Sequence, residues 1–169
     1  HELLSANGFR RSHNFLYKPI CDDCNACVPV RVDARTFTLN RSFARVIRIN
    51  SDLEVTIKAP IATAENFDLF HYYQTLRHQD GDMAIMSFDE YRMMIEESPV
   101  ETVLVEYRDT KRDLLGISLT DRMNDGLSMV YSFFHPEQKH RSLGTAMILQ
   151  HIVQAGIDRI SYVYLGYWI

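Results

Sequence analysis

Residues 131–152 read YSFFHPEQKHRSLGTAMILQHI and combine the end of an apolar strand, a polar loop and an amphipathic helix. The loop closes with the pattern R-x-x-G-x-A, which runs from Arg141 to Ala146. The first N–H groups of a helix have no partner within the helix, and together with the helix dipole they attract an anion. Gly144 lets the backbone approach such a ligand closely, and Arg141 adds a fixed positive charge. The stretch therefore predicts an anion-binding loop, with an ordinary strand–helix turn as the alternative.

The sequence on either side of this stretch predicts a mainly antiparallel sheet flanked by helices. Thr63 is a suitable N-cap for one helix, and Ser87 with Glu90 has the spacing of a capping box for a second. An Asn-Asp-Gly turn favours a hairpin between the last two of three consecutive strands. The expected elements are helices 64–78 and 88–98, strands 101–107, 114–123 and 127–135, helix 145–156 and strand 161–169.

The first sixty residues differ in character, because they hold all three cysteines and a concentration of arginine. Gly8 is placed to end an N-terminal helix in the left-handed conformation. We therefore predict an α+β protein of two domains, a small cysteine-containing domain over residues 1–60 and a second domain over residues 61–169. Within the first domain we expect strands at 15–19, 28–37 and 53–60, and either a strand or a short helix at 40–49.

Length and composition are those of a soluble globular protein: 169 residues, 46% hydrophobic and 24% charged. No apolar run approaches the ~20 residues of a membrane span, so we expect no membrane partner. Three cysteines are an odd number for a disulfide framework, which favours reduced thiols and a cytoplasmic location. His1 is not an initiator Met and the final YLGYWI resembles a strand cut short, so we expect a piece of a longer protein.

Charge is distributed unevenly along the chain. The whole sequence has a formal net charge of −4, yet residues 1–50 carry eight Lys or Arg and only four Asp or Glu. Seven of those eight cations are arginine, which suits bidentate recognition of phosphate or carboxylate. The N-terminal part is therefore expected to meet an anion, with a merely solvated basic face as the alternative.

The order of the expected elements resembles the GNAT acyltransferase fold. In that fold the loop equivalent to R-x-x-G-x-A holds the pyrophosphate of acetyl-CoA, and the acyl group lies beside the preceding strand. Further motifs resemble the arginyl-/leucyl-tRNA–protein transferase family, especially its bacterial type: GFRRSHNFLYKP, C-x-x-C-x-A-C-V-P-V-R-V, F-x-x-N-R-S, YSFFHP with RSLGTAMILQHI, and YLGYWI. They cover nearly the whole chain, although the family commonly has another cysteine upstream and a Lys/Met/Tyr-rich tail. The resemblance implies a cysteine-containing domain followed by a GNAT-like domain.

The resemblance also implies an activity. Members of the family move leucine, or arginine in eukaryotes, from a charged tRNA to the α-amine of proteins beginning with Asp or Glu, which marks these proteins for degradation in the N-degron pathway. The expected partners are therefore an aminoacyl-tRNA, Leu-tRNA for the bacterial type, and proteins with an acidic N-terminus. The ester is already activated, so the reaction needs a deprotonated amine, alignment and oxyanion stabilisation, and no cofactor.

Three residues near the anion-binding loop are candidates for catalysis. His135 has an ordinary pKa near ~6.5 and is placed to accept a proton from the amine, although it also suits a strand end before Pro136. Tyr131 and Ser132 are candidates for positioning or oxyanion contact, and Tyr131 fits the core equally well. By the resemblance, the loop faces the terminal adenosine of the tRNA or its phosphate through Arg141, Ser142, Gly144 and Thr145.

The arginines of the N-terminal part are candidates for substrate binding. Arg10 and Arg11 point to opposite faces if GFRRS is extended. One of them would pair with the acidic side chain of the substrate, while the other would support a wall, meet tRNA or simply be exposed. The remaining candidates are Ser12 and Tyr17, which we expect to line the same region, and Arg41 and Arg45, which share a face if helical and suit tRNA phosphate.

Cys21, Cys24 and Cys27 have the spacing of metal ligands, since zinc knuckles and iron–sulfur loops both use C-x-x-C. Three thiolates leave one coordination position open, for which His13 or an upstream cysteine is a candidate. Relatives with such cysteines imply a zinc ion or an iron–sulfur cluster in the intact protein. The alternative is that the thiols are simply buried or redox-sensitive.

Two other functions are compatible with the same residues. The first is an acetyl-CoA-dependent GNAT N-acetyltransferase, because the R-x-x-G-x-A loop alone does not distinguish CoA from tRNA. The second is a non-catalytic RNA-binding module, which predicts binding with a steep salt dependence and no product.

Overall fold

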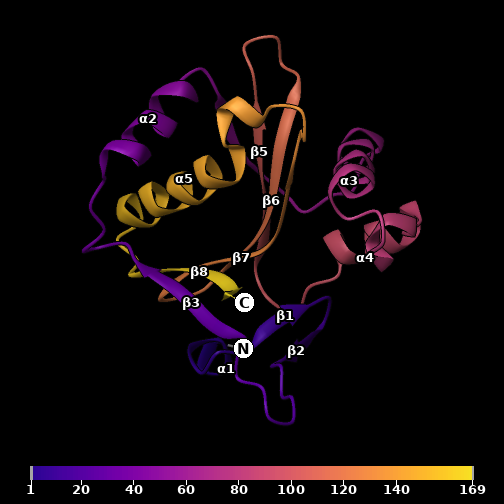
Figure 1. Cartoon of the computed structure of the whole chain (residues 1–169), viewed down its shortest axis with the longest axis vertical. Helices are drawn as coiled ribbons and strands as arrows, with labels where there is room; N and C mark the ends of the chain where they lie inside the picture. The colour runs from indigo at the N-terminus through magenta and orange to yellow at the C-terminus, as the bar shows by residue number, and fades with distance from the viewer. Residues whose placement is uncertain (1, 169) are drawn as a thin grey trace.

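A computed structural model describes residues 2–168 of the chain. Its centre is a six-stranded sheet with the strand order β3-β8-β7-β6-β5-β4 (Figure 1). All neighbouring strands are antiparallel except β7 and β8, which are parallel. This confirms the predicted α+β class with a mainly antiparallel sheet. The strands are β3 (Val28–Asp33), β4 (Glu54–Lys58), β5 (Thr102–Arg108), β6 (Leu114–Arg122), β7 (Gly126–Phe134) and β8 (Tyr162–Trp168).

Helices cover both faces of this sheet. In Figure 1, α2 (Arg41–Ile49) and α5 (Leu143–Ile157) lie on one side of the central strands, and α3 (Ala64–Arg77) and α4 (Phe88–Glu96) lie on the other. Each face has its own apolar cluster. The α3 and α4 side buries Phe70, Tyr91, Ile117 and Phe133, and the α5 side buries Met147, Ile152, Ala155 and Val163. Within residues 2–168, no helix combines the length and apolarity needed to cross a bilayer.

Helix starts follow the capping residues in the sequence. The Thr63 hydroxyl accepts from the Asn66 backbone N–H, and the Asn66 side chain accepts from the Thr63 backbone N–H. Ser87 and Glu90 form the predicted capping box of α4. The ambiguous segment 40–49 is helical, because Asn40 caps it through the Phe43 N–H and the helix packs on α5.

The two parallel strands, β7 and β8, separate soon after they meet. β7 and β8 pair only from Gly126–Tyr162 to Ser128–Tyr164, and β8 also pairs with β3 on its other edge. Gly126 allows the close start of this pairing, since a Cβ there would lie 2.6 Å from the Tyr162 carbonyl oxygen. Beyond Ser128 the two strands diverge, and a gap opens between β7 and β8 that we call the splay.

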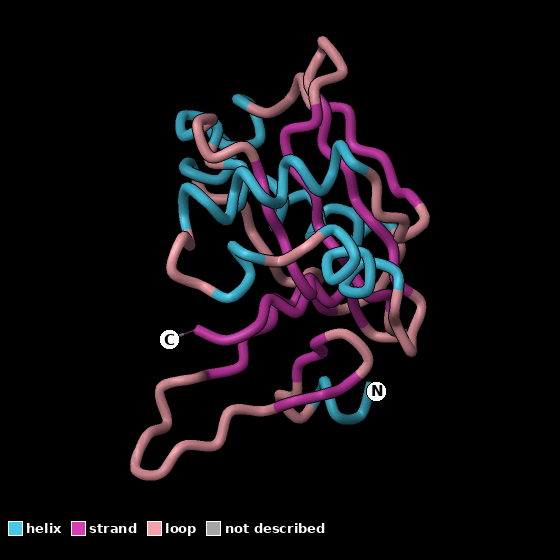
Figure 2. Tube along the Cα trace, turned by 90° about the vertical axis from the view of Figure 1, so that its right-hand side faces the viewer, coloured by secondary structure: helices cyan, strands magenta, loops and turns pink. Residues whose placement is uncertain are grey.

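The N-terminal segment packs at the end of the sheet where the splay begins. It contains α1 (Glu2–Ala6) and a separate hairpin of β1 (Arg10–Ser12) and β2 (Phe15–Tyr17). Gly8 ends α1 with φ +86°, as predicted. The cysteine loop, residues 18–27, extends away from the body of the molecule (Figure 2). The predicted domain boundary at residue 60 falls between β4 and α3, and strands from both sides of it belong to the one large sheet.

Two short 3₁₀ turns complete the structure. One, η1 (Asp82–Ile85), lies between α3 and α4. The other, η2 (Lys139–Arg141), lies in the loop that connects β7 to α5. The second turn brings this loop back toward the start of α5.

Candidate active site at the start of helix α5

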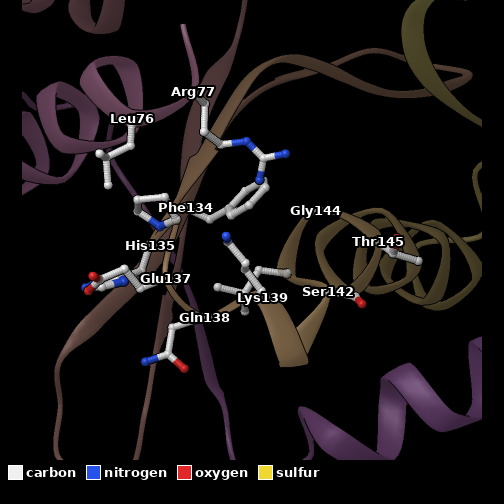
Figure 3. A pocket seen from close by; sticks show the side chains of 12 residues that line it. Leu76, Arg77, Phe134, His135, Glu137, Gln138, Lys139, Ser142, Gly144 and Thr145 are labelled. Carbon is white, nitrogen blue, oxygen red and sulfur yellow. The ribbon is translucent and has the colours of Figure 1, made fainter. Parts of the chain in front are cut away.

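A cavity of about 780 Å³ lies where β7 ends and α5 begins. Its wall is formed by the last turn of α3, the end of β7, the η2 loop and the first turn of α5. Figure 3 shows the side chains that line it, with the start of α5 on one side and His135 and Glu137 on the other. The cavity is therefore open to the helix terminus at which the sequence predicts an anion.

Two cations reach into the cavity from different elements. Arg77 is the last residue of α3, and its guanidinium carbon lies 5.4 Å from the centroid of the Phe134 ring. Lys139 of η2 points toward the same ring from the opposite wall (Figure 3). Neither residue was among the candidates from the sequence. In the sequence, Arg77 is a cation at the C-terminus of a helix, where cations are common, so it gives no signal of a site. Only the packing of α3 against β7 brings Arg77 to this loop.

Three of the predicted loop residues line the cavity: Ser142, Gly144 and Thr145. Ser142 begins α5 in the left-handed conformation, with φ 51°. Gly144 lies against the edge of Phe134, because a Cβ at this position would come within 3.1 Å of the ring. The first turn of α5 thus stands directly over an aromatic ring, with its unpaired N–H groups at the cavity.

Arg141 does not line this cavity, contrary to the expectation that it would supply the charge of the site. Its guanidinium binds both carboxylate oxygens of Asp52, at 2.8 and 2.9 Å. The Asn50 side chain also donates to the Arg141 carbonyl at 2.7 Å. Asp52 raises the pKa of Arg141, and Arg141 lowers the pKa of Asp52. Arg141 therefore ties the loop to the segment between α2 and β4.

The three predicted catalytic residues face different directions. His135 lines the cavity, its ring meets Tyr72 edge-on, and its buried Nδ1 has no hydrogen-bond partner within the described residues. Tyr131 points to the α3 face, where its hydroxyl accepts from Gln74, and burial raises its pKa. Ser132 is its neighbour and so points to the α5 face, with its hydroxyl 2.9 Å from that of Ser118. The alternation of side chains along β7 keeps Tyr131 and Ser132 apart.

Arg10 and Arg11 are both buried, with 9% and 6% of their surface exposed. The alternative that one of the pair is merely exposed is therefore wrong. Arg11 forms a bidentate ion pair with Asp121, 2.7 Å on each arm, and also donates to the His13 carbonyl. Asp121 further accepts from Thr102 at 2.7 Å. The hairpin packs on β6 through Arg11 and on β7 through Arg10, so the side chains on both faces of β1 are buried.

Arg10 reaches the mouth of the splay. It donates to the Ser128 hydroxyl at 3.2 Å, in the last β7–β8 pair, and to the Met129 carbonyl at 2.7 Å, just past that pair. Both acceptors are neutral, and burial lowers the pKa of the guanidinium. Arg10 also lines a cavity of about 170 Å³ together with Arg31 and Gly166. The structure thus places a desolvated cation beside the separated strands.

The other predicted substrate-binding residues lie in the hairpin itself or on the surface of α2. Ser12 is half-buried next to the His13 ring, and Tyr17 is exposed beside Tyr167. Arg41 and Arg45 are exposed, one helical turn apart on α2. They share a face of the helix, as expected for the helical alternative, and they lie apart from the residues that line the large cavity.

The cysteine loop does not form a ligand set in this structure. Cys21 and Cys24 are exposed and meet at an isolated β-bridge, and Cys27 is half-buried further along. Among residues 2–168, no three Cys, His, Asp or Glu side chains gather closely enough to hold a metal ion. The residues as arranged do not fit a zinc ion or a cluster, so no chemical step is assigned to one, and metal binding by these thiols stays a prediction.

The fold is the GNAT-like fold that the sequence predicts. The fold consists of antiparallel strands, a splayed parallel pair and a helix that starts at an open cavity. The solved structure of L-PGS from Bacillus licheniformis superposes with a TM-score of 0.61 over 82% of this chain and 44% of that chain. At 10% sequence identity, this likeness concerns the fold alone.

The chain belongs to the arginine-tRNA-protein transferase family. A family model described as "Arginine-tRNA-protein transferase, C terminus" matches residues 65–169, and its N-terminal counterpart matches residues 1–45. The aspartate/glutamate leucyltransferase of Granulibacter bethesdensis is 48% identical over 169 residues, and that of Paramagnetospirillum magneticum is 49% identical over 169 residues. Both alignments cover 100% of this chain, which spans 63% and 69% of the two relatives.

Proposed function

We propose that the protein containing this chain is an aminoacyl-tRNA–protein transferase of the leucyl type. It would move leucine from Leu-tRNA to the α-amine of proteins that begin with Asp or Glu, and so mark them for degradation in the N-degron pathway. The observation that carries the proposal is the cavity at the start of α5, where Arg77 and Lys139 supplement the helix terminus. The names of the relatives, aspartate/glutamate leucyltransferase, support the choice of substrates.

In this proposal the cavity binds the 3′ end of the tRNA. A phosphate of the terminal nucleotides would lie between Arg77, Lys139 and the first N–H groups of α5, and Phe134 would offer its ring to the adenine. The aminoacyl ester would then extend along β7 toward the splay. Its carbonyl carbon is attacked by the amine, the C–N bond forms, and the bond to the ribose oxygen breaks. Binding both substrates in one gap supplies the alignment that aminolysis needs.

The acidic N-terminal side chain of the protein substrate would pair with Arg10. A buried guanidinium whose hydrogen-bond acceptors are neutral gains more from a carboxylate than an exposed one does, because the attraction is less screened by water. The 170 Å³ cavity beside Arg10 has room for a carboxylate side chain. A peptide with an uncharged first side chain would leave Arg10 without this partner, which provides discrimination. Arg41 and Arg45 would contact the body of the tRNA at its phosphates.

The proposed reaction belongs in the cytoplasm. Cys21, Cys24 and Cys27 are free thiols, and two of them are exposed, which suits a compartment that keeps thiols reduced. Their part in the proposal is to shape the loop between the hairpin and β3, and a metal bound there would be structural rather than catalytic.

The test is transfer of radiolabelled leucine by the full-length protein. Leu-tRNA is mixed with a peptide that begins with Asp, and a peptide of the same sequence beginning with Ala is the control. We expect label in the Asp peptide only. Acetyl transfer from acetyl-CoA to the same peptide, or tRNA binding without any labelled product, would instead support the acetyltransferase or the RNA-binding module and reject the proposal.

A further inference from the structure

A chain of polar side chains runs from the edge of the splay into the core beneath α5. Ser132 of β7 meets Ser118 of β6 with their hydroxyl oxygens 2.9 Å apart. Thr120 Oγ1 lies 3.3 Å from the Ser118 oxygen and 2.9 Å from Nε2 of His151 on α5. Nδ1 of His151 in turn lies 2.7 Å from the Met147 carbonyl oxygen. Four side chains from three elements thus form one connected path.

The outer end of this path is accessible and the inner end is not. Ser132 is half-buried, whereas Ser118, Thr120 and His151 are 0%, 1% and 2% exposed. Ser132 also lies two residues before Phe134, so both point to the same face of β7, about 7 Å apart along the strand. Because Phe134 lies in the wall of the large cavity, Ser132 is the next side chain inward, beyond the last β7–β8 pair.

The Met147 carbonyl determines which nitrogen of His151 carries the proton. A carbonyl only accepts, so Nδ1 must donate to it, and burial lowers the pKa of His151 so that the neutral ring is favoured. Nε2 is then unprotonated and accepts from Thr120. Thr120 has a single hydroxyl proton, which the geometry directs at the Ser118 oxygen, 3.3 Å away. Once this proton turns to Nε2, Thr120 can accept from Ser118, which accepts from Ser132. In this state every hydroxyl proton points inward, and the lone pairs of Ser132 face the splay.

Protonation of His151 reverses the path. Nε2 then donates to Thr120, whose own proton passes to Ser118, and the Thr120–Ser118 geometry fits this direction. Ser132 ends up donating outward instead of accepting. The path therefore has two arrangements, and the charge of one buried ring selects between them.

Few other charges act on His151 among the described residues. The Tyr107 hydroxyl lies 3.4 Å from Nδ1, and burial raises the pKa of that phenol, so it stays neutral. A small cavity of about 40 Å³ beside the ring is lined at its rim by Arg122 and Asp158, which carry opposite charges. Arg122 also pairs with Glu101 at 3.5 Å. The protonation of His151 is thus governed mainly by its burial, which lowers the pKa of the ring, and then by the Met147 carbonyl, which raises it.

We propose that Ser132 is the catalytic group that takes the proton from the attacking amine, and that Ser118, Thr120 and His151 are its relay. As the C–N bond forms, an amine proton passes to Ser132 while the Ser132 proton moves inward, and Nε2 of His151 gains one. When the C–O bond breaks, the path runs backward and the ribose oxygen receives the proton. No proton is gained or lost overall. This inference rests on the proposed function and assigns its acid–base step to residues outside the large cavity.

The test is the pH dependence of leucyl transfer in the full-length protein, measured in single turnovers from about pH 5 to pH 9. Ionisation of the peptide amine alone, with a pKa near ~8, gives a log-rate slope of one on the acid side. A requirement for neutral His151 raises that slope to two below the pKa of the ring. Because burial lowers the pKa of the ring, the slope of two belongs to the acid end of the profile of the unmodified protein. In Thr120→Val we expect a slope of one there and a rate roughly 100-fold lower across the profile.

Matched variants separate the relay from its surroundings. Thr120→Val keeps the shape of the side chain and removes only the hydroxyl that connects Ser118 to His151. Ser132→Ala, at a half-buried position, should also reduce the slope from two to one. Tyr107→Phe removes a hydroxyl from the other side of the same ring and should keep it. All of these variants retain His135, so its ionisation does not account for a difference among them.

The outcomes distinguish the inference from the function on which it rests. A Thr120→Val protein that keeps the slope of two, or that transfers leucine as fast as the unmodified protein, overturns the relay. An unmodified protein that transfers no leucine overturns the proposed function itself. Thermal unfolding of each variant, with a midpoint near that of the unmodified protein, shows that the loss is not one of folding.

Discussion

Arg11, which was a candidate for substrate binding, forms a buried ion pair with Asp121 in the structure. Their side chains are 1% and 0% exposed, and the two groups neutralise one another at the junction of the hairpin and β6. Removal of either partner leaves a buried charge, which typically costs about 3–5 kcal/mol. We therefore expect Arg11→Met to lower the free energy of unfolding by an amount of this order, measured by urea denaturation.

An exposed ion pair of the same composition provides the control. Arg35 pairs with Asp33 at 2.8 Å, and its side chain is 61% exposed. Exposed pairs contribute about 0–1 kcal/mol, so Arg35→Gln should change the unfolding free energy very little. An Arg11→Met protein no less stable than Arg35→Gln would mean that the hairpin does not depend on this pair.

Gly144 and Gly156 are both on α5 and respond oppositely to an added side chain. A Cβ at Gly144 would meet Phe134 at 3.1 Å, whereas a Cβ at Gly156 has nothing within 4 Å. We expect Gly144→Val to displace the Phe134 ring into the cavity and to raise the Kd for charged tRNA by about tenfold, which is ~1.4 kcal/mol. Filter binding with Leu-tRNA measures this.

Gly156→Ala is the comparison for the same helix. It should leave tRNA binding unchanged and raise the free energy of unfolding by up to about 1 kcal/mol, because alanine restricts the unfolded chain more than glycine does. Equal Kd values for the two glycine variants would show that the ligand does not approach the first turn of α5.

At the scale of the element, α2 presents a basic face that the cavity does not use. Arg41 and Arg45 lie one turn apart and are exposed, and the opposite side of the helix packs on α5. If this face meets tRNA, each arginine releases about one counterion. The double variant Arg41→Gln, Arg45→Gln should therefore reduce the slope of log K against log salt by about two.

Arg92 of α4 serves as the matched control for that measurement. It is exposed and forms an (i, i+3) pair with Asp89 on the far side of the sheet. Arg92→Gln should leave the salt slope of tRNA binding as it is. A slope that falls as much in Arg92→Gln as in the α2 variant would assign the effect to net charge rather than to a surface of α2.

The helices and strands that sequence reasoning predicted well are those with local signals. Thr63 and Ser87 are caps whose partners lie three residues away, so the starts of α3 and α4 follow from a few neighbouring letters. The sequence pattern of segment 40–49 did not distinguish a strand from a helix, because its apolar residues suit either. Asn40 as cap and the packing against α5 select the helix, and the second of these is a tertiary contact.

In the candidate site, too, the residues with a local sequence signal were predicted and those placed by tertiary contacts were not. Ser142, Gly144 and Thr145 were predicted because the strand, loop and helix around them are contiguous in sequence. Arg77 lies more than sixty residues earlier, and its place beside Phe134 depends on how α3 packs. Arg141 was predicted to be the cation of the site, but its guanidinium is instead paired with Asp52. Neither outcome has a signature in the surrounding sequence.

At the scale of the whole molecule, the family models and the sheet divide the chain differently. The N-terminal model ends at residue 45 and the C-terminal model begins at residue 65. The sheet nevertheless takes β3 and β4 from before residue 60 and places them at its two edges. Each edge strand covers backbone N–H and C=O groups of a neighbour, β8 or β5, that would otherwise stand open.

This arrangement predicts that the second part does not fold by itself. A fragment of residues 61–169 would lose β3, β4 and α2, and it would leave Asp121 buried without Arg11. We expect the fragment to give a poorly dispersed amide NMR spectrum and no cooperative thermal transition. The chain of residues 1–169, prepared in parallel, should give both. A dispersed spectrum from the fragment would show instead that residues 61–169 are an autonomous domain and that β3 and β4 only dock on its edges. The position of Arg10 would then be a matter of docking as well, and the selectivity proposed for Arg10 would be separable from the proposed transfer site.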